Sequence, residues 1–136
     1  MNPAISEQRS ATRKAAPFSG SAKSYRELSV WQRSIELTVA LYKLTGAFPR
    51  EELFGLTSQL RRASVSIASN IAEGYGRASR GEYRNFLGIA RGSALEVQTQ
   101  LVVARALDYG DPNQIAAAEK LADDTGKMLW AMMQKL

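Results

Sequence analysis

The fold is decided by residues 79–107, SRGEYRNFLGIARGSALEVQTQLVVARAL. This stretch opens with Ser79-Arg80-Gly81-Glu82, which has the S-x-x-E form of a helix capping box. Behind the cap, apolar and small residues recur at spacings of three and four; they are Tyr83, Leu87, Ala90, Ala94, Val97, Leu101 and Ala104. The pattern predicts one long helix, and its alanines would let a second helix approach closely.

A first helix is predicted over about residues 28–45. It carries two adjacent apolar seams, so a broad face should be buried. One seam is Leu28, Trp31, Ile35 and Tyr42, and the other is Val30, Leu37, Leu41, Leu44 and Phe48. Gly46 and Pro49 end this helix, since glycine is favourable past a helix end and proline cannot continue one.

A second helix is predicted from near Leu53, with apolar residues at spacings of three and four. It ends at Gly74 and Gly76, which we interpret as helix punctuation. The same spacing places Asn70 and Gly74 on or beside the inner face of the helix. A side-chain amide there would need a hydrogen-bond partner.

The last helix is predicted to start at Asp111-Pro112, an N-cap residue followed by proline in the first turn. Its core stripe is Ile115, Ala118, Ala122, Thr125, Leu129, Met132 and Leu136. Trp130 and Met133 fall outside that stripe. Either they contribute to a subunit interface or the core face of this helix is wide.

Short connections between long helices favour antiparallel neighbours. The expected fold is therefore all-α: an antiparallel up-down-up-down four-helix bundle over residues 25–136. A disordered basic N-terminal tail, residues 1–24, is expected before it, because that stretch has too little apolar content to fold.

The net charge of +5 is unevenly distributed. Residues 1–26 hold five basic groups against one acidic group, a net of +4, whereas residues 27–136 hold 13 basic groups against 12 acidic groups, a net of +1. The domain is nearly neutral, and the charge belongs mainly to the tail. Two interpretations of the tail remain open: a solubilising segment, or a basic arm that contacts RNA or DNA.

The chain has no histidine and no cysteine. It therefore lacks the commonest general base, the commonest neutral metal ligand and any disulfide. No metal, cofactor or small-molecule substrate is expected. No apolar run is long enough to span a membrane, so we expect a bacterial-type cytoplasmic protein. A hydrolase that uses Glu73 or Glu96 with a divalent metal is the weakest functional alternative.

Polar residues on the two central helices are the candidates for function: Arg61, Arg62, Asn70, Glu73, Arg77, Arg80, Arg84, Arg91, Ser93 and Glu96. One interpretation is structural, with Arg62 or Arg77 paired to Glu73 or Glu96. The other leaves Arg61, Arg77, Arg80 and Arg84 around the turn between these helices as a phosphate-binding edge.

Several motifs resemble the family named after 23S ribosomal RNA intervening sequences, over roughly residues 25–136. The clearest are Ser58-Gln59-Leu60-Arg61-Arg62-Ala63, Ser66-Ile67 and Asn70-Ile71-Ala72-Glu73-Gly74-Tyr75-Gly76-Arg77. Further matches are Val30-Trp31-Gln32, Phe48-Pro49, Phe86-Leu87, Gly92-Ser93 and the stretch from Glu96 through Leu101.

The resemblance implies a four-helix bundle that assembles into a homopentamer. A related group serves as accessory proteins of the reverse transcriptases of diversity-generating retroelements, in which a basic barrel contacts nucleic acid and the polymerase. This chain departs from that group in its near-neutral domain. Carried over by position, the motif residues are Arg61, Arg62, Asn70, Glu73, Gly74, Arg77, Ser93 and Glu96.

These features lead to a non-catalytic, homo-oligomeric binding or scaffold module. Its leading partner is RNA or a nucleoprotein, and DNA or a reverse transcriptase are further candidates. A protein scaffold that binds no nucleic acid is the alternative. As a hypothesis, Asn70, Glu73, Ser93 and Glu96 form an inter-helix polar network with Arg62. In the same hypothesis, Arg61, Arg77 and Arg80 face the partner.

Overall fold

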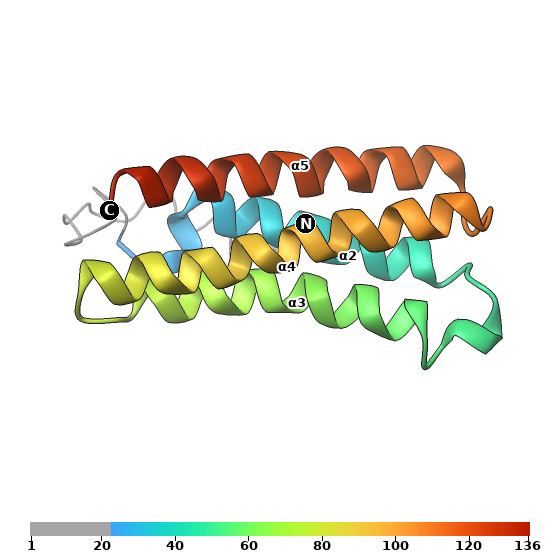
Figure 1. Cartoon of the computed structure of the whole chain (residues 1–136), viewed down its shortest axis with the longest axis horizontal. Helices are drawn as coiled ribbons and strands as arrows, with labels where there is room; N and C mark the ends of the chain where they lie inside the picture. The colour runs from blue at the N-terminus through green and yellow to red at the C-terminus, as the bar shows by residue number, and fades with distance from the viewer. Residues whose placement is uncertain (1–22) are drawn as a thin grey trace.

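The computed structural model describes residues 23–136, and every regular element within that range is helical. Four long helices lie side by side (Figure 1). The elements in order are the 3-10 turn η2 (Tyr25–Glu27), α2 (Ser29–Thr45), the 3-10 turn η3 (Arg50–Glu52), α3 (Leu56–Tyr75), α4 (Arg80–Ala106) and α5 (Pro112–Gln134).

The helices form a four-sided bundle with antiparallel neighbours. Helix α3 packs against α2 and α4, and α5 closes the bundle by packing against α4 and α2. Successive helices are joined by short connections, which reverse the chain direction each time (Figure 1). The predicted all-α, up-down-up-down architecture is confirmed.

Local capping explains where α4 and α5 begin. The Ser79 hydroxyl accepts the backbone N–H of Glu82 at 3.1 Å, and the Asp111 carboxylate accepts that of Asn113 at 3.0 Å. The second helix, predicted from near Leu53, begins slightly later, because α3 starts at Leu56 after a non-helical Gly55. The Glu52 carboxylate accepts the N–H of Leu56 at 3.0 Å and so caps α3 from the preceding 3-10 turn.

The buried core includes the whole predicted stripe of α4 and most of the predicted stripe of α5. All seven stripe residues of α4, from Tyr83 to Ala104, are buried. On α2 only one of the two predicted seams is fully buried. Trp31 and Ile35 are half-buried and Tyr42 is 44% exposed, because they lie at the edge of α2, where the Arg61 guanidinium covers the Tyr42 ring at 4.6 Å.

The two glycines at the end of α3 have different roles. Gly76 follows the last helical residue and caps α3, as predicted. Gly74 is buried inside the last turn, and a Cβ there would lie 2.7 Å from the Cβ of Phe86. Its interpretation as punctuation is therefore wrong. Gly74 is small because α3 and α4 approach closely beside their turn.

The expectation of a disordered tail, residues 1–24, falls mostly outside the described residues. The description starts at Lys23, and the Ser24 hydroxyl caps η2 by accepting the N–H of Arg26 at 3.1 Å. The first helical turn thus begins at Tyr25, where the domain was expected to start. None of the helices in residues 23–136 is long and apolar enough to span a membrane.

Candidate functional site

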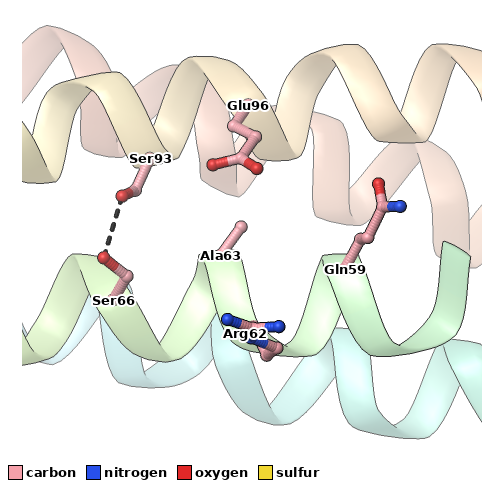
Figure 2. A pocket seen from close by; sticks show the side chains of 6 residues that line it. All are labelled: Gln59, Arg62, Ala63, Ser66, Ser93 and Glu96. Atoms are coloured by element: carbon pink, nitrogen blue, oxygen red, sulfur yellow. Dashed lines mark hydrogen bonds between the residues drawn. The ribbon is translucent and has the colours of Figure 1, made fainter. Parts of the chain in front are cut away.

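A groove of about 340 Å³ lies between α3 and α4. Its lining residues share the facing sides of the two helices and are Gln59, Arg62, Ala63 and Ser66 of α3 with Ser93 and Glu96 of α4 (Figure 2). Spacings of three and four keep such residues on one helix face. The groove therefore collects polar residues that the sequence motifs had singled out.

A pair of hydroxyl groups joins the two walls at one end of this groove, and an amide supports it from α3. The Ser66 and Ser93 hydroxyl oxygens lie 3.0 Å apart in a hydrogen bond between the helices (Figure 2). The Asn70 amide donates to the Ser66 carbonyl at 2.8 Å and to its hydroxyl at 3.0 Å. The Asn70 side-chain amide, which was predicted to need a hydrogen-bond partner, therefore has one.

Two opposite charges face the same groove without pairing. Figure 2 shows the Glu96 carboxylate directed from α4 toward α3, above Ala63. Its hydrogen bond comes from the Gln100 amide at 3.3 Å. Arg62 on the α3 side forms no hydrogen bond or ion pair within residues 23–136. The groove therefore presents an anion and a cation that do not neutralise each other directly.

The polar network that sequence reasoning suggested is present only in part. The structure links Asn70 to Ser93 through Ser66. Glu73 is not connected to these groups, because its carboxylate is paired with Arg77 near the end of α3. Arg62 and Glu96 lie in the same groove but take no part in the hydrogen bonds that join its walls.

The arginines at the α3–α4 turn lie on the bundle surface. Arg77 donates to Glu73 at 2.8 Å, an exposed ion pair, and its guanidinium lies 4.7 Å from the Phe86 ring centroid. Arg84 donates to the Met133 carbonyl at 3.2 Å, so it is held by a neutral group and its charge is not cancelled. Arg80, also exposed, is the first residue of α4.

Arg61 does not belong to that group, contrary to the sequence-based grouping. It lies in the second turn of α3, so the helical rise places it about 21 Å along the axis from Tyr75, the last residue of the helix, and Arg77 follows beyond that end. Its guanidinium donates to the Thr45 hydroxyl at 2.9 Å and packs over Tyr42 on α2. The helix length that separates these residues could have been read from the sequence.

Trp130 and Met133 have different surroundings. Trp130 is 47% exposed beneath the Arg91 guanidinium, which lies 4.8 Å from its ring centroid. Met133 is half-buried and packs against the core. Sequence reasoning missed Leu95 and Val102, which are exposed apolar residues on α4. Their spacing of seven, off the core stripe, was the available signal.

The two ends of the bundle differ in charge. The turn with Arg77, Arg80 and Arg84 lies at the same end as the start of η2 and the C-terminus (Figure 1), which add Lys23, Arg26 and Lys135. Three acidic side chains, Glu27, Glu73 and Glu82, lie at this end as well, so basic groups outnumber acidic ones there by six to three. The acidic side chains at the other end come from the α2–α3 and α4–α5 connections and are Glu51, Glu52, Asp108 and Asp111.

Two tyrosines near the ends of α4 have raised pKa values for structural reasons. Burial, with a smaller contribution from Tyr75, raises the pKa of Tyr83 to about 12. The Tyr109 hydroxyl donates to Glu52 at 3.0 Å, and this hydrogen bond is the main cause of its raised pKa. Within residues 23–136 no group of three or more acidic side chains could hold a metal ion.

Comparison with known families agrees with the geometry. The model of the 23S rRNA-intervening sequence protein family matches residues 26–131. The chain belongs to this family. Among solved structures, it is similar to a Bacteroides thetaiotaomicron protein of unknown function from the S23 ribosomal protein family. The two share 25% identity with a TM-score of 0.69, covering 76% of this chain and 97% of that one. No match is found among curated proteins.

Proposed function

We propose that this chain is a non-catalytic, self-associating cytoplasmic bundle that binds RNA or a nucleoprotein, such as a reverse transcriptase complex. The observation that carries the proposal is the gathering of basic side chains at the α3–α4 turn, at the end where residues 1–22 join Lys23. Those residues add Arg9, Arg13 and Lys14 against Glu7. One end of an otherwise near-neutral domain thus has the charge that attracts phosphates.

The contacts of these arginines are compatible with phosphate binding. Arg84 is oriented by a neutral carbonyl and keeps its full charge. Arg77 shares its charge with Glu73, but the pair is exposed and a surface ion pair is weak. A phosphate could therefore replace or join Glu73 at little cost. The name of the family, which refers to ribosomal RNA, agrees with an RNA partner.

Self-association is supported by apolar side chains outside the core. Leu95, Val102 and Trp130 are exposed, and Val102 is 62% exposed on α4. Apolar surface of this kind marks interaction sites when the residues are contiguous. We propose that copies of the chain pack through it, as a homopentamer in line with the family resemblance.

A scaffold that binds only proteins is the second candidate. Phe54, in the connection before α3, is 92% exposed, and Leu53 beside it is half exposed. They lie at the acidic end of the bundle, where phosphate would be repelled. This end favours a protein partner. The metal-dependent hydrolase is less supported, because Glu73 is paired with Arg77 while Glu96 lies in a different part of the α3–α4 face.

The first test measures the mass of the full chain by light scattering and titrates fluorescent RNA and DNA at two salt concentrations. A variant combining Arg80→Gln and Arg84→Gln should bind more weakly. Its salt slope should be lower by about 1 for every phosphate that these arginines no longer neutralise. Arg50→Gln, which removes the same type of charge at the acidic end, is the matched control.

A third variant replaces Arg9, Arg13 and Lys14 by Gln and measures the part that the N-terminal residues play. Binding that disappears only in this variant would assign the phosphate contacts to those residues and leave the turn arginines structural. An assembled protein that binds neither RNA nor DNA would contradict the nucleic-acid part of the proposal and favour the protein scaffold.

A further inference from the structure

The groove between α3 and α4 is lined by two exposed side chains of opposite charge, Arg62 and Glu96, which do not pair with each other. Arg62 has no partner within residues 23–136, which contrasts with Arg61, Arg77 and Arg84, each of which is held by a named contact. Glu96 lies on the facing helix, and the two form no ion pair. Charged side chains that face one groove and remain separate leave donors and acceptors open to a guest.

The Glu96 carboxylate is held in one orientation by a neighbouring amide. The Gln100 amide donates to one oxygen of Glu96 from one turn further along α4. Gln100 is itself buried, and its own carbonyl oxygen has no partner within residues 23–136. Gln100 therefore contacts one oxygen of a carboxylate that points across Ala63 toward α3 (Figure 2).

We propose that this groove binds an unstacked guanine base of single-stranded RNA, with Glu96 and Arg62 reading its edge. The inference rests on the proposed RNA-binding function and names the base that the groove selects. Guanine presents N1–H and N2–H as two adjacent donors, which match the two oxygens of a carboxylate. Beside them lie the acceptors O6 and N7, and one arginine side chain can donate a hydrogen bond to each of them.

The other bases fit this pair of charges less well. Adenine and cytosine each present one amino group next to a ring-nitrogen acceptor, which would face a carboxylate oxygen. Uracil has a single N–H between two carbonyl groups, and both carbonyls would repel the carboxylate. A groove with an oriented anion beside a cation therefore discriminates guanine by donors and acceptors alone.

The size and position of the groove agree with such a guest. A volume of about 340 Å³ lies at the lower end of the range of roughly 300–1,000 Å³ common for small-ligand sites. Along α3, the helical rise places Arg62 about 20 Å from Tyr75, the last residue before the turn that carries Arg77. A short single strand lying along α3 and α4 could therefore contact the basic end with its phosphates while one base enters the groove.

The test uses the full chain and labelled single-stranded oligouridine of about 12 nucleotides. One uridine is replaced by guanosine, inosine, adenosine or cytidine. Inosine keeps N1–H, O6 and N7 and lacks only the 2-amino group, so it isolates one of the two contacts to Glu96. We expect guanosine to bind roughly tenfold more tightly than adenosine or cytidine, with inosine in between.

Matched variants test whether the guanosine preference arises from the groove. Glu96→Gln should abolish the guanosine preference while general RNA binding persists, because an amide offers one acceptor and one donor. Glu36→Gln, an equal charge change at an exposed position of α2, should keep it. Arg62→Gln should lower the guanosine preference, whereas Arg50→Gln should not.

Three results would overturn the inference. Equal, salt-sensitive binding of all oligonucleotides would leave RNA binding standing and remove base selection. Absence of RNA binding would contradict both the proposed RNA-binding function and the base selection. A change of mass on light scattering in Glu96→Gln, without any base preference in the unmodified protein, would show that a second copy of the chain covers the groove.

Discussion

The hydroxyl oxygens of Ser66 on α3 and Ser93 on α4 lie 3.0 Å apart, and this hydrogen bond joins the two walls of the groove. Ser93 is buried, so its hydroxyl would lose solvation without a partner if Ser66 were absent. The Asn70 amide adds a donor to Ser66 from the same helix face. The register between α3 and α4 is thus marked by one hydrogen bond between the helices, which Asn70 supports from α3.

Removing either hydroxyl should destabilise the bundle. We expect Ser66→Ala and Ser93→Ala each to lower the free energy of unfolding by about 0.5–1.5 kcal/mol, because each leaves the other hydroxyl with one partner fewer. The double variant should cost less than the sum of the two. Urea denaturation of all four proteins measures this coupling, and strictly additive effects would show that the hydroxyls do not interact in solution.

The close approach of α3 and α4 beside their turn predicts opposite effects at two helical glycines. Gly74→Ala should lower the free energy of unfolding by about 1–3 kcal/mol, because the new methyl group would overlap Phe86 and Tyr83. Gly92→Ala on α4 meets open space and should raise it by up to about 1 kcal/mol through helix propensity.

Thermal and urea unfolding of these two glycine variants checks both signs in one experiment. An unchanged stability in Gly74→Ala would mean that the turn relaxes enough to accept the methyl group. The Gly92→Ala result then shows whether the assay detects a change of the expected size.

Alkaline pH should weaken the fold through Tyr83. Burial raises the pKa of this phenol from 10.0 to about 12, so the folded state holds the proton more tightly than the unfolded state. The resulting stability is complete below pH 10 and is lost as the pH rises toward 12. Tyr83→Phe should have a shallower decline of unfolding free energy over this window. If the unfolding free energy declined equally steeply in both proteins, a group other than Tyr83 would be responsible for the loss of stability.

Self-association through the exposed apolar side chains predicts a charge-sensitive surface on α4. Val102→Lys should lower the mass measured by light scattering, because the ammonium group would have to be desolvated in an interface. The melting temperature of the isolated bundle should hardly change, since Val102 is 62% exposed. Gln114→Lys adds the same charge at an exposed position of α5 and should leave the mass unchanged. If the Val102→Lys protein kept the mass of the unmodified assembly, the interface would lie on another face.

Much of the fold could be predicted because its signals are local. The capping box at Ser79 and the Asp111-Pro112 start depend on residues within one turn, and both occur in the structure. The core stripe of α4 follows from helical periodicity alone. The start of α3 lies slightly later than predicted because Glu52 caps it from outside the helix, a contact that no local pattern indicates.

The sequence predicted which residues belong to the candidate site, but not which of them pair with each other. Motif residues such as Arg62, Ser93 and Glu96 were identified from the sequence, yet the sequence favoured no single pairing among them. The structure pairs Arg77 with Glu73 and leaves Arg62 without a partner in residues 23–136. Residues four apart on one helix are certain neighbours, whereas contacts between helices depend on the register of packing.

The sequence by itself determined an all-helical bundle, the core stripe of α4 and the concentration of positive charge toward the N-terminus. These properties follow from periodicity, capping and composition, which are fixed by neighbours along the chain. Only the tertiary structure decided that Ser66 meets Ser93, that Gly74 must be small, and that Arg62 and Glu96 share a groove without pairing. Each depends on the rotation and spacing of α3 against α4, which arise from the packing of both helices at once.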